Sequence, residues 1–371
     1  MKGTVLITGG AGFIGSHLAS ELLRAGYQVR VLDSLIPQVH GERPQRPAYL
    51  HKDAELMIGD VRNPEDVYKA LAGVDAVYHF VALVGVGQSM YQIADYTSVN
   101  NSGTAVLLER LVKRRVSKLI VASSMSVYGE GRYVTDDGQK YDQVTRSTRQ
   151  LKAREWEMLA PDGSPLRPLR TPEDKQPTLA SVYALSKYDQ EQMCLIVGRA
   201  YGVPTVALRF FNVYGPHQSL SNPYTGVLAI FASRLINRQR PIIFEDGQQL
   251  RDFVSVYDVA QACRLALEVD AARDMVFNVG SGHTVTVANV AKALAKVLGK
   301  QIEPEITGDH RVGDIRHCFP DISLAERVLG YRPAMTLEKG MRDLAKWLDQ
   351  QTAHDRFNEM RAELTARGLV V

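Results

Sequence analysis

The stretch Thr4-Val5-Leu6-Ile7-Thr8-Gly9-Gly10-Ala11-Gly12-Phe13-Ile14-Gly15 joins a short apolar run to glycines at every third position. The run at residues 3–8 predicts a buried strand, and apolar residues near helical spacing through 13–25 predict the helix after it. Because glycines lack Cβ atoms, the turn between them can be tight and a pyrophosphate can approach the N–H groups that open the helix. The stretch therefore predicts a dinucleotide site. The expected contacts are Gly9, Gly12, Phe13, Ile14 and Gly15.

Apolar strands alternate with amphipathic helices through the first two hundred residues. Strands are expected at 29–32, 56–58, 76–80, 118–122 and 206–211, and helices at 64–71, 103–113 and 182–201. Such alternation is typical of a parallel sheet covered on both faces. We predict an α/β fold with a Rossmann-like, doubly wound parallel sheet in residues 1–212. A smaller mixed α/β substrate-binding region is expected at 213–353, and a tail at 354–371.

Residues 131–181 interrupt the alternation. Arg, Lys, Asp, Pro and Gly dominate them, with Trp156 and Met158 as isolated apolar points. We interpret the segment as a long insertion in the first domain, which is either an ordered lid or binding element or a disordered surface excursion. The tail is either a surface helix or a frayed end.

Composition excludes several classes of function. The 371 residues include 44 basic and 41 acidic side chains, a net charge of +3, which argues against a general nucleic-acid binder. Cys194, Cys263 and Cys318 lie far apart and predict neither a metal site nor a disulfide framework, as suits a reducing compartment. No cleavable signal is visible, and no apolar stretch reaches the roughly 18–20 residues of a membrane helix. We expect a cytoplasmic protein without metal, membrane or nucleic-acid partners.

Asp33 ends the second expected strand. At that place a carboxylate can accept hydrogen bonds from the adenosine ribose hydroxyls, and its charge would repel a 2′-phosphate. The expected cofactor is therefore NAD rather than NADP.

Three residues form a candidate catalytic group. Ser124 follows the strand at 118–122, and ligands of open parallel sheets lie beyond the carboxyl ends of the strands. Tyr183 and Lys187 are one helical turn apart on one face of a helix. A phenol has a pKa near 10 and needs a nearby cation to act as a base at neutral pH. We expect Lys187 to supply that charge and also to reach the nicotinamide ribose.

These motifs resemble those of the extended short-chain dehydrogenase/reductases that act on nucleotide sugars. The resemblance includes the segments 79–89, 208–216, 251–254 and 311–314, and it covers nearly all the chain apart from the insertion and the tail. It implies cofactor contacts in addition to the glycine loop, Asp33, Tyr183 and Lys187: Asp60, Val61, Phe80, Ala82, Val84, Asn100 and Phe211. It implies these substrate contacts: Ser124, Ser126, Asn212, Phe244, Arg251 and Arg311.

Within this family the residues favour a 4-epimerase. A 4,6-dehydratase needs an acid and a base where this chain has Met125 and Ser126, and a 3,5-epimerase or synthase needs a Cys or His beside the serine. Oxidation and re-reduction at C4 remains, with Tyr183 taking and returning the hydroxyl proton. Two alternatives stay open: a net reductase that consumes NAD(P)H, and a non-catalytic NAD-sensing protein.

The substrate is suggested by the insertion. Trp156-Glu157, the segment 161–166 and Ser221–Val227 are similar to those of dTDP-L-rhamnose 4-epimerases. The resemblance implies conversion of dTDP-L-rhamnose to dTDP-6-deoxy-L-talose, with UDP-hexose or UDP-uronate 4-epimerisation as the alternative. The insertion lacks the cysteines of some relatives, so no zinc is expected. The family resemblance also implies a homodimer, in which the helices expected at 103–114 and 183–200 form the interface.

Overall fold

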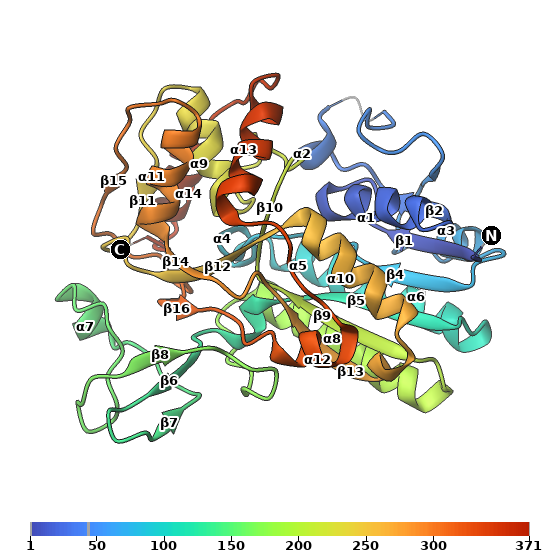
Figure 1. Cartoon of the computed structure of the whole chain (residues 1–371), viewed down its shortest axis with the longest axis horizontal. Helices are drawn as coiled ribbons and strands as arrows, with labels where there is room; N and C mark the ends of the chain where they lie inside the picture. The colour runs from blue at the N-terminus through green and yellow to red at the C-terminus, as the bar shows by residue number, and fades with distance from the viewer. Residues whose placement is uncertain (1, 43–44, 371) are drawn as a thin grey trace.

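A computed structural model describes residues 2–42 and 45–370. Its centre is a seven-stranded sheet of order β13-β9-β5-β4-β1-β2-β3, in which every pair of neighbours is parallel (Figure 1). The strands are β1 (Thr4–Thr8), β2 (Gln28–Asp33), β3 (Glu55–Ile58), β4 (Ala76–His79), β5 (Lys118–Ser124), β9 (Thr205–Phe210) and β13 (Met275–Val279). The chain turns back between β1 and β4, which is where such sheets bind ligands. The predicted Rossmann-like fold is confirmed.

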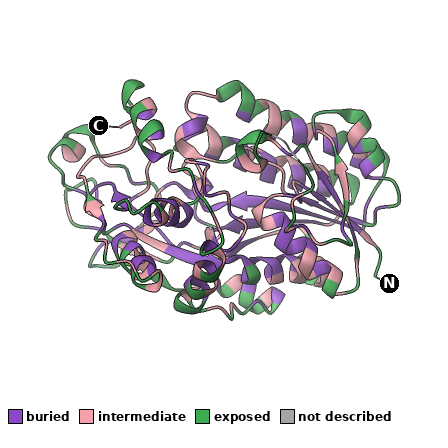
Figure 2. Ribbon diagram, turned by 90° about the horizontal axis from the view of Figure 1, so that it is seen from above, coloured by how far each residue is buried: buried purple, intermediate pink, exposed green. Residues whose placement is uncertain are grey.

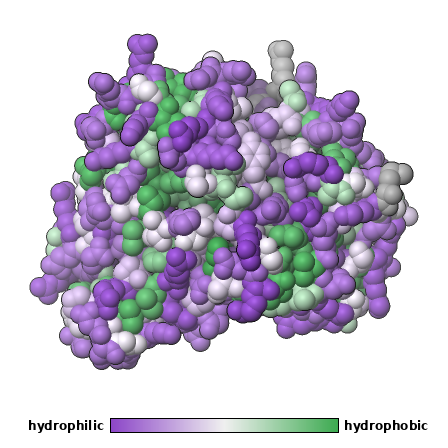
Figure 3. All heavy atoms as spheres, viewed as in Figure 1, coloured by the Kyte–Doolittle hydropathy of each residue, from purple (hydrophilic) through white to green (hydrophobic). Residues whose placement is uncertain are grey.

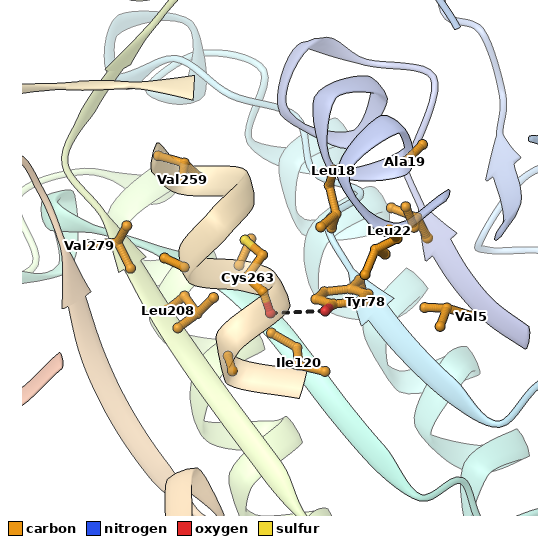
Figure 4. Close-up of a cluster of buried hydrophobic side chains, with 14 of the residues drawn as sticks. Val5, Leu18, Ala19, Leu22, Tyr78, Ile120, Leu208, Val259, Cys263 and Val279 are labelled. Carbon is orange, nitrogen blue, oxygen red and sulfur yellow. Dashed lines mark hydrogen bonds between the residues drawn. The ribbon is translucent and has the colours of Figure 1, made fainter. Parts of the chain in front are cut away.

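Helices cover both faces of this sheet. One face carries α1 (Phe13–Arg24), α10 (Val256–Glu268) and α12 (Ser323–Leu329), and the other carries α3 (Pro64–Ala70), α6 (Gly103–Lys113) and α8 (Val182–Tyr201). Between α1 and α10, the Tyr78 hydroxyl donates to the Cys263 carbonyl at 2.9 Å within a buried apolar cluster (Figure 4). Burial on both faces explains why the central strands β4, β5 and β9 are buried at every residue, in purple in Figure 2, and why their sequences are largely apolar.

The chain after β9 forms a second, smaller body but crosses back to the sheet. The smaller body contains β10 (Asn212–Tyr214), α9 (Val227–Ile236), β11 (Ile242–Ile243), β12 (Leu250–Ser255), β14 (Thr284–Thr286), α11 (Val287–Val297), β15 (Glu305–Ile306), β16 (His317–Cys318) and α13 (Leu337–Leu348). In contrast, α10, β13 and α12 belong to the large sheet and its covering layer. Residues 213–353 are therefore shared between both bodies, and a single boundary at 212/213 is too simple.

The insertion is ordered. It forms a small antiparallel sheet of β7 (Lys140–Tyr141), β6 (Arg132–Val134) and β8 (Arg167–Leu169), together with α7 (Thr148–Lys152), and it projects at the lower left of Figure 1. Its own apolar cluster includes Tyr133, Val144, Met158 and Leu166. Met158 is thus a core residue of the insertion, and the disordered alternative is wrong.

The tail forms α14 (Phe357–Ala366), whose apolar side chains pack beside β11. The remaining elements are short: α2 (Pro37–His40), α4 (Val86–Ser89), α5 (Ile93–Tyr96), a π-helical turn (Thr97–Ser102) and 3-10 turns at Met125–Tyr128 and Asp270–Ala272. In the described ranges, no helix combines the length and apolarity needed to cross a bilayer. Polar side chains cover most of the face in Figure 3, with apolar groups scattered among them.

Candidate active site

A cleft of about 600 Å³ lies at the carboxyl ends of the strands, between the large sheet and the smaller body. Every residue that the sequence analysis assigned to cofactor or substrate lines this cleft, with the exception of Asn100. Asn100 is fully buried beneath it: its side chain accepts from the Leu83 N–H at 2.8 Å and donates to Leu83 O at 3.1 Å and to Ser186 Oγ at 2.9 Å. It holds the cleft-lining segment 80–84 in place instead of lining the cleft itself.

The glycine loop has no room for a side chain at Gly9 or at Gly15. Gly9 has φ +71°, and a Cβ there would lie 2.8 Å from the Val81 backbone. A Cβ on Gly15 would lie 2.5 Å from the Cα of Gly10, so the helix packs directly on the turn. Gly12 precedes the first residue of α1 and lines the cleft, which leaves the helix N-terminus open to an anion. This cradle fits a pyrophosphate.

Asp33 stands beside the loop at the end of β2. One carboxylate oxygen accepts from the Ala11 N–H at 3.0 Å and the other from the Leu35 N–H at 2.9 Å. Each oxygen keeps a further lone pair. Since the side chain lines the cleft, it is able to accept from ribose hydroxyls.

Asp60 and Val61 follow β3 at the cleft edge. The Arg62 guanidinium donates to Asp60 at 2.9 and 3.0 Å through Nε and holds the pKa of that carboxyl below its usual range. Asp60 is therefore an ionised acceptor at neutral pH.

Ser124 and Tyr183 meet over the end of β5. The Ser124 hydroxyl donates to Ser126 Oγ at 3.1 Å, and the Ser126 N–H donates back to Ser124 Oγ at 3.1 Å. Burial raises the pKa of Tyr183 above its usual 10, while a hydrogen bond with Ser124 opposes that rise. The Tyr183 N–H donates to Ser89 Oγ at 3.0 Å, which fixes the start of α8. The two hydroxyls thus converge on one point of the cleft.

Lys187 is almost completely buried below Tyr183, and burial lowers its pKa to about 8. Its ammonium donates to Gln190 Oε1 at 2.6 Å. The Gln190 amide in turn donates to Thr104 Oγ1 at 2.9 Å and to Val81 O at 3.2 Å. The charge that we expected to favour the phenolate is therefore held by Gln190, which the sequence analysis missed although it lies one turn along the same helix.

His79 is a satisfied interior residue at the end of β4. Its ring contacts Thr8 Oγ1 at 3.0 Å and Thr104 Oγ1 at 2.8 Å. Burial, together with the charge of Lys187, lowers its pKa to about 3, so it is neutral at physiological pH.

The two arginines reach the cleft from adjacent segments. Arg251 donates from Nη1 to the carbonyls of Leu250 and Arg316, each at 2.9 Å. Arg311 binds the Asp314 carboxylate at 2.8 and 2.9 Å and stacks over the Phe244 ring at 4.7 Å. Both guanidiniums retain N–H groups for a diphosphate.

Further features of the cleft fit a polar ligand. Asn212 Oδ1 is a buried oxygen without a hydrogen-bond partner among the described residues, and its side chain lines the cleft. Buried polar atoms are rarely left unsatisfied, so a ligand donor is expected there. No group of three or more His, Cys, Asp or Glu side chains in residues 2–42 and 45–370 is arranged to hold a metal ion.

One wall of the cleft was not expected from the sequence. Met360 and Leu364 of α14 line it, together with Tyr224 from the loop before α9. The signal available for α14 was its apolar spacing at Phe357, Met360 and Leu364, which indicates a packed helix face.

The chain matches the NAD dependent epimerase/dehydratase family over residues 5–151 and 158–280. The chain belongs to that family. Its cofactor is NAD, in agreement with the cradle at the glycine loop and with Asp33, and it is an isomerase of the sugar-epimerase type.

Individual relatives cover nearly the whole chain. A dTDP-L-rhamnose 4-epimerase of Burkholderia thailandensis is 36% identical over 94% of this chain and 95% of its own length. A putative UDP-glucose 4-epimerase of Methanocaldococcus jannaschii is 31% identical over 93% and 98%. Among solved structures, a UDP-glucose 4-epimerase of Thermotoga maritima, crystallised with UDP-glucose, aligns with a TM-score of 0.77 at 30% identity, covering 94% of this chain and 99% of that one.

Proposed function

We propose that this NAD-dependent nucleotide-sugar 4-epimerase converts dTDP-L-rhamnose to dTDP-6-deoxy-L-talose. The observation that carries the proposal is the convergence of Ser124, Tyr183 and Lys187 in the same cleft as the glycine loop and two arginines. The choice of sugar is supported by the similarity to a dTDP-L-rhamnose 4-epimerase over nearly the full length.

In the proposed mechanism, Tyr183 moves the proton of the sugar 4-hydroxyl. Bound NAD supplies the redox chemistry, because it accepts a hydride from C4 and can return one. Ser124 hydrogen-bonds Tyr183 and lies where it can share the sugar 4-oxygen. Lys187, with a pKa lowered to about 8, still carries a proton through most of the neutral range and supplies positive charge below the phenol. Arg251 and Arg311 hold the diphosphate while the 4-keto sugar rotates and presents its opposite face to the nicotinamide. Tyr183 can then return the proton to the 4-oxygen.

A UDP-hexose or UDP-uronate substrate is the second candidate. It is favoured by the full-length likeness to UDP-glucose 4-epimerases and to a Bacillus cereus UDP-glucuronic acid 4-epimerase, which aligns with a TM-score of 0.77 at 27% identity. A diphosphate would bind the same two arginines in either case. The two candidate substrates therefore differ only in the nucleotide base and in the substituents of the sugar.

The test is turnover of a substrate panel without added cofactor. Purified protein is incubated with dTDP-L-rhamnose, dTDP-glucose, UDP-glucose and UDP-glucuronate, and the products are identified by NMR. The expected result is a 6-deoxy-L-talose product from dTDP-L-rhamnose with no net NADH consumption. Faster turnover of a UDP-sugar would replace the proposed substrate with the second candidate. Stoichiometric NADH oxidation would indicate a reductase, and bound NAD without any turnover would indicate a sensor.

We also propose a cytoplasmic homodimer that pairs through α6 and α8. Leu185 and Ile196 on α8 are 45% and 60% exposed, although both are large and apolar. Exposed apolar side chains of this size on one helix suit a subunit interface. Analytical ultracentrifugation should give a dimer mass, and Ile196→Glu should shift it to that of the monomer.

A further inference from the structure

The C-terminal helix α14 brings one apolar face to the substrate cleft. Phe357, Met360 and Leu364 follow one another at helical spacing and are each no more than 3% exposed. Met360 and Leu364 line the cleft. From Phe357 to Leu364 the helix rises by about 10 Å, which is the length scale of a nucleotide sugar's diphosphate and hexose.

The two ends of this face meet different parts of the cleft. The Phe357 ring packs against Phe244, with centroids 6.4 Å apart, and Phe244 also stacks under Arg311. At the other end, a Cβ on Gly87 would lie 3.2 Å from Leu364 Cδ2. Gly87 closely follows Phe80–Val84, the segment that lines the cleft beside Tyr183. The helix thus runs from Phe244 and Arg311 at one end of the cleft towards Gly87 at the other, close to Ser89, which accepts from the Tyr183 N–H.

Polar contacts hold α14 in this position. Glu363 accepts from the Tyr91 hydroxyl at 3.0 Å and from the Tyr224 hydroxyl at 3.1 Å. Arg361 donates to Asp309 at 2.6 Å. After the helix, the Val312 N–H donates to the Leu369 carbonyl at 3.0 Å, next to Arg311. The tail is therefore fastened on both sides of the cleft, and its apolar face is a fixed wall.

We propose that Leu364 and Met360 are specificity-determining residues that form the wall against the substituent at C6 of the sugar. An apolar wall at that place accepts a methyl group. A hydroxymethyl or carboxylate group there loses its hydration without gaining a hydrogen-bond donor, because the neighbouring Tyr224 hydroxyl already donates to Glu363. The wall thus selects 6-deoxyhexoses, and this assignment deepens the proposed function, on which it rests.

The experiment compares two substrates that differ only at C6. dTDP-L-rhamnose and dTDP-L-mannose share base, linkage and ring stereochemistry, and kcat/KM is measured for both. The wild-type protein should prefer the 6-deoxy sugar by at least about tenfold, since one apolar contact of this size is worth roughly 10–200-fold. Leu364→Gln should reduce that preference by about tenfold or more, whereas Leu364→Met, which keeps the wall apolar, should retain it.

Controls separate a specificity effect from loss of structure. Glu359→Gln, on the exposed face of α14, should leave both substrates unchanged. Bound NAD should stay at the wild-type level in every variant. Should Leu364→Gln fail to fold, Met360→Gln tests the wall at the adjacent turn. Equal losses for both sugars would overturn the proposal and leave α14 as a purely structural element.

The proposed role of Leu364 and Met360 and the proposed substrate can be refuted independently. If the wild-type protein does not act on dTDP-L-rhamnose but epimerises UDP-glucose, the proposed substrate is wrong. The same variants are then compared on UDP-glucose and UDP-6-deoxyglucose. A smaller advantage of the 6-deoxy sugar in Leu364→Gln would support the wall in that setting, and an unchanged ratio would refute it.

Discussion

The cofactor half of the cleft is built from turns that follow successive strands of one sheet, whereas the substrate half is assembled from segments far apart in the sequence. The glycine loop directly follows β1, Asp33 ends β2, and Asp60 lies two residues beyond the end of β3. In the substrate half, Glu245 binds Arg146 of the insertion at 2.7 Å and Arg316 at 3.0 Å. The cofactor half depends on backbone geometry and local sequence. The substrate half depends on buried ion pairs between residues that are far apart in the sequence. Variants in the two halves should therefore fail in different ways.

The largest effect is expected where the halves meet. Tyr183→Phe removes the hydroxyl that moves the proton but keeps the ring, so kcat should fall by about 10²–10⁴-fold. Bound NAD and the KM for the nucleotide sugar should change little, because neither half of the cleft is altered. Stopped assays with NMR detection measure kcat, and absorbance of the denatured extract measures NAD. Tyr201→Phe, at the exposed end of the same helix, is the matched control, and near-normal turnover in Tyr183→Phe would rule out the proposed role.

The second prediction breaks the substrate half alone. Arg316 is 1% exposed on its side chain and binds Glu245, Asp246 and Glu157. Arg316→Met leaves the buried carboxylate of Glu245 with less compensation and should lower the free energy of unfolding by about 3–5 kcal/mol. Arg342→Met removes an exposed pair with Glu338 and should cost less than about 1 kcal/mol. Urea unfolding compares the two.

Arg316→Met should also impair the substrate half of the cleft without impairing the cofactor half. The backbone carbonyl of Arg316 accepts from Arg251, so loss of the ion pairs should displace that arginine and raise the KM for the nucleotide sugar. The NAD content of the folded fraction should stay at the wild-type level. A fall in NAD content without a change in KM would show that the two halves are not independent.

The contrast also explains what could be predicted from the sequence. Gly9 and Asp33 were found because they stand at the ends of two strands, and Tyr183 and Lys187 because they lie one turn apart on one helix. Both signals are local in the sequence. The return of β13 to the sheet was not predicted, because β13 pairs with β9 about seventy residues earlier in the chain. No local sequence pattern identifies such a distant partner. The 212/213 boundary failed for this reason.

Order in the insertion was hidden in the same way. Its cluster joins Tyr133, Val144 and Leu166, which have no periodic spacing and become neighbours through the antiparallel pairing of β6 with β7 and with β8. Gln190 was missed and Asn100 was expected to contact the cofactor, because burial, rather than residue type, decides that Gln190 holds Lys187 and that Asn100 holds the segment 80–84.

A third, smaller effect is expected in the cofactor half. Asp33→Asn removes the charge that repels a 2′-phosphate and weakens the hydrogen bonds offered to ribose hydroxyls. Affinity for NAD should fall by about tenfold and the discrimination against NADP should shrink, since a hydrogen bond to a charged group contributes about 1.5–3 kcal/mol. The KM for the nucleotide sugar, measured at saturating NAD, should be unchanged. Isothermal titration of the cofactor-free protein tests this, with exposed Asp53→Asn as control.

The smallest effect concerns how the insertion is attached. Hydrogen bonds from His317 and Arg316 lower the pKa of Glu157 to about 2 from its usual 4.5. The lowered pKa means that the ionised carboxylate is favoured in the folded protein. Its contribution to docking is fully present above pH 4.5 and is lost as the pH falls through about 2. Trp156, the adjacent residue, is 9% exposed and should report the release of the insertion.

This last prediction can be measured by fluorescence in a Trp347→Phe background, where Trp156 is the remaining tryptophan. Its emission should shift to longer wavelength between pH 4.5 and 2, because water reaches the indole once Glu157 is protonated. In Glu157→Gln the side chain carries no charge at any pH, so this acid transition should disappear and the shift should already be present in part at neutral pH. If both proteins gave the same acid profile, the Glu157 contacts would not hold the insertion, and the dependence of the substrate half on long-range ion pairs would rest on the pairs of Glu245 with Arg146 and Arg316.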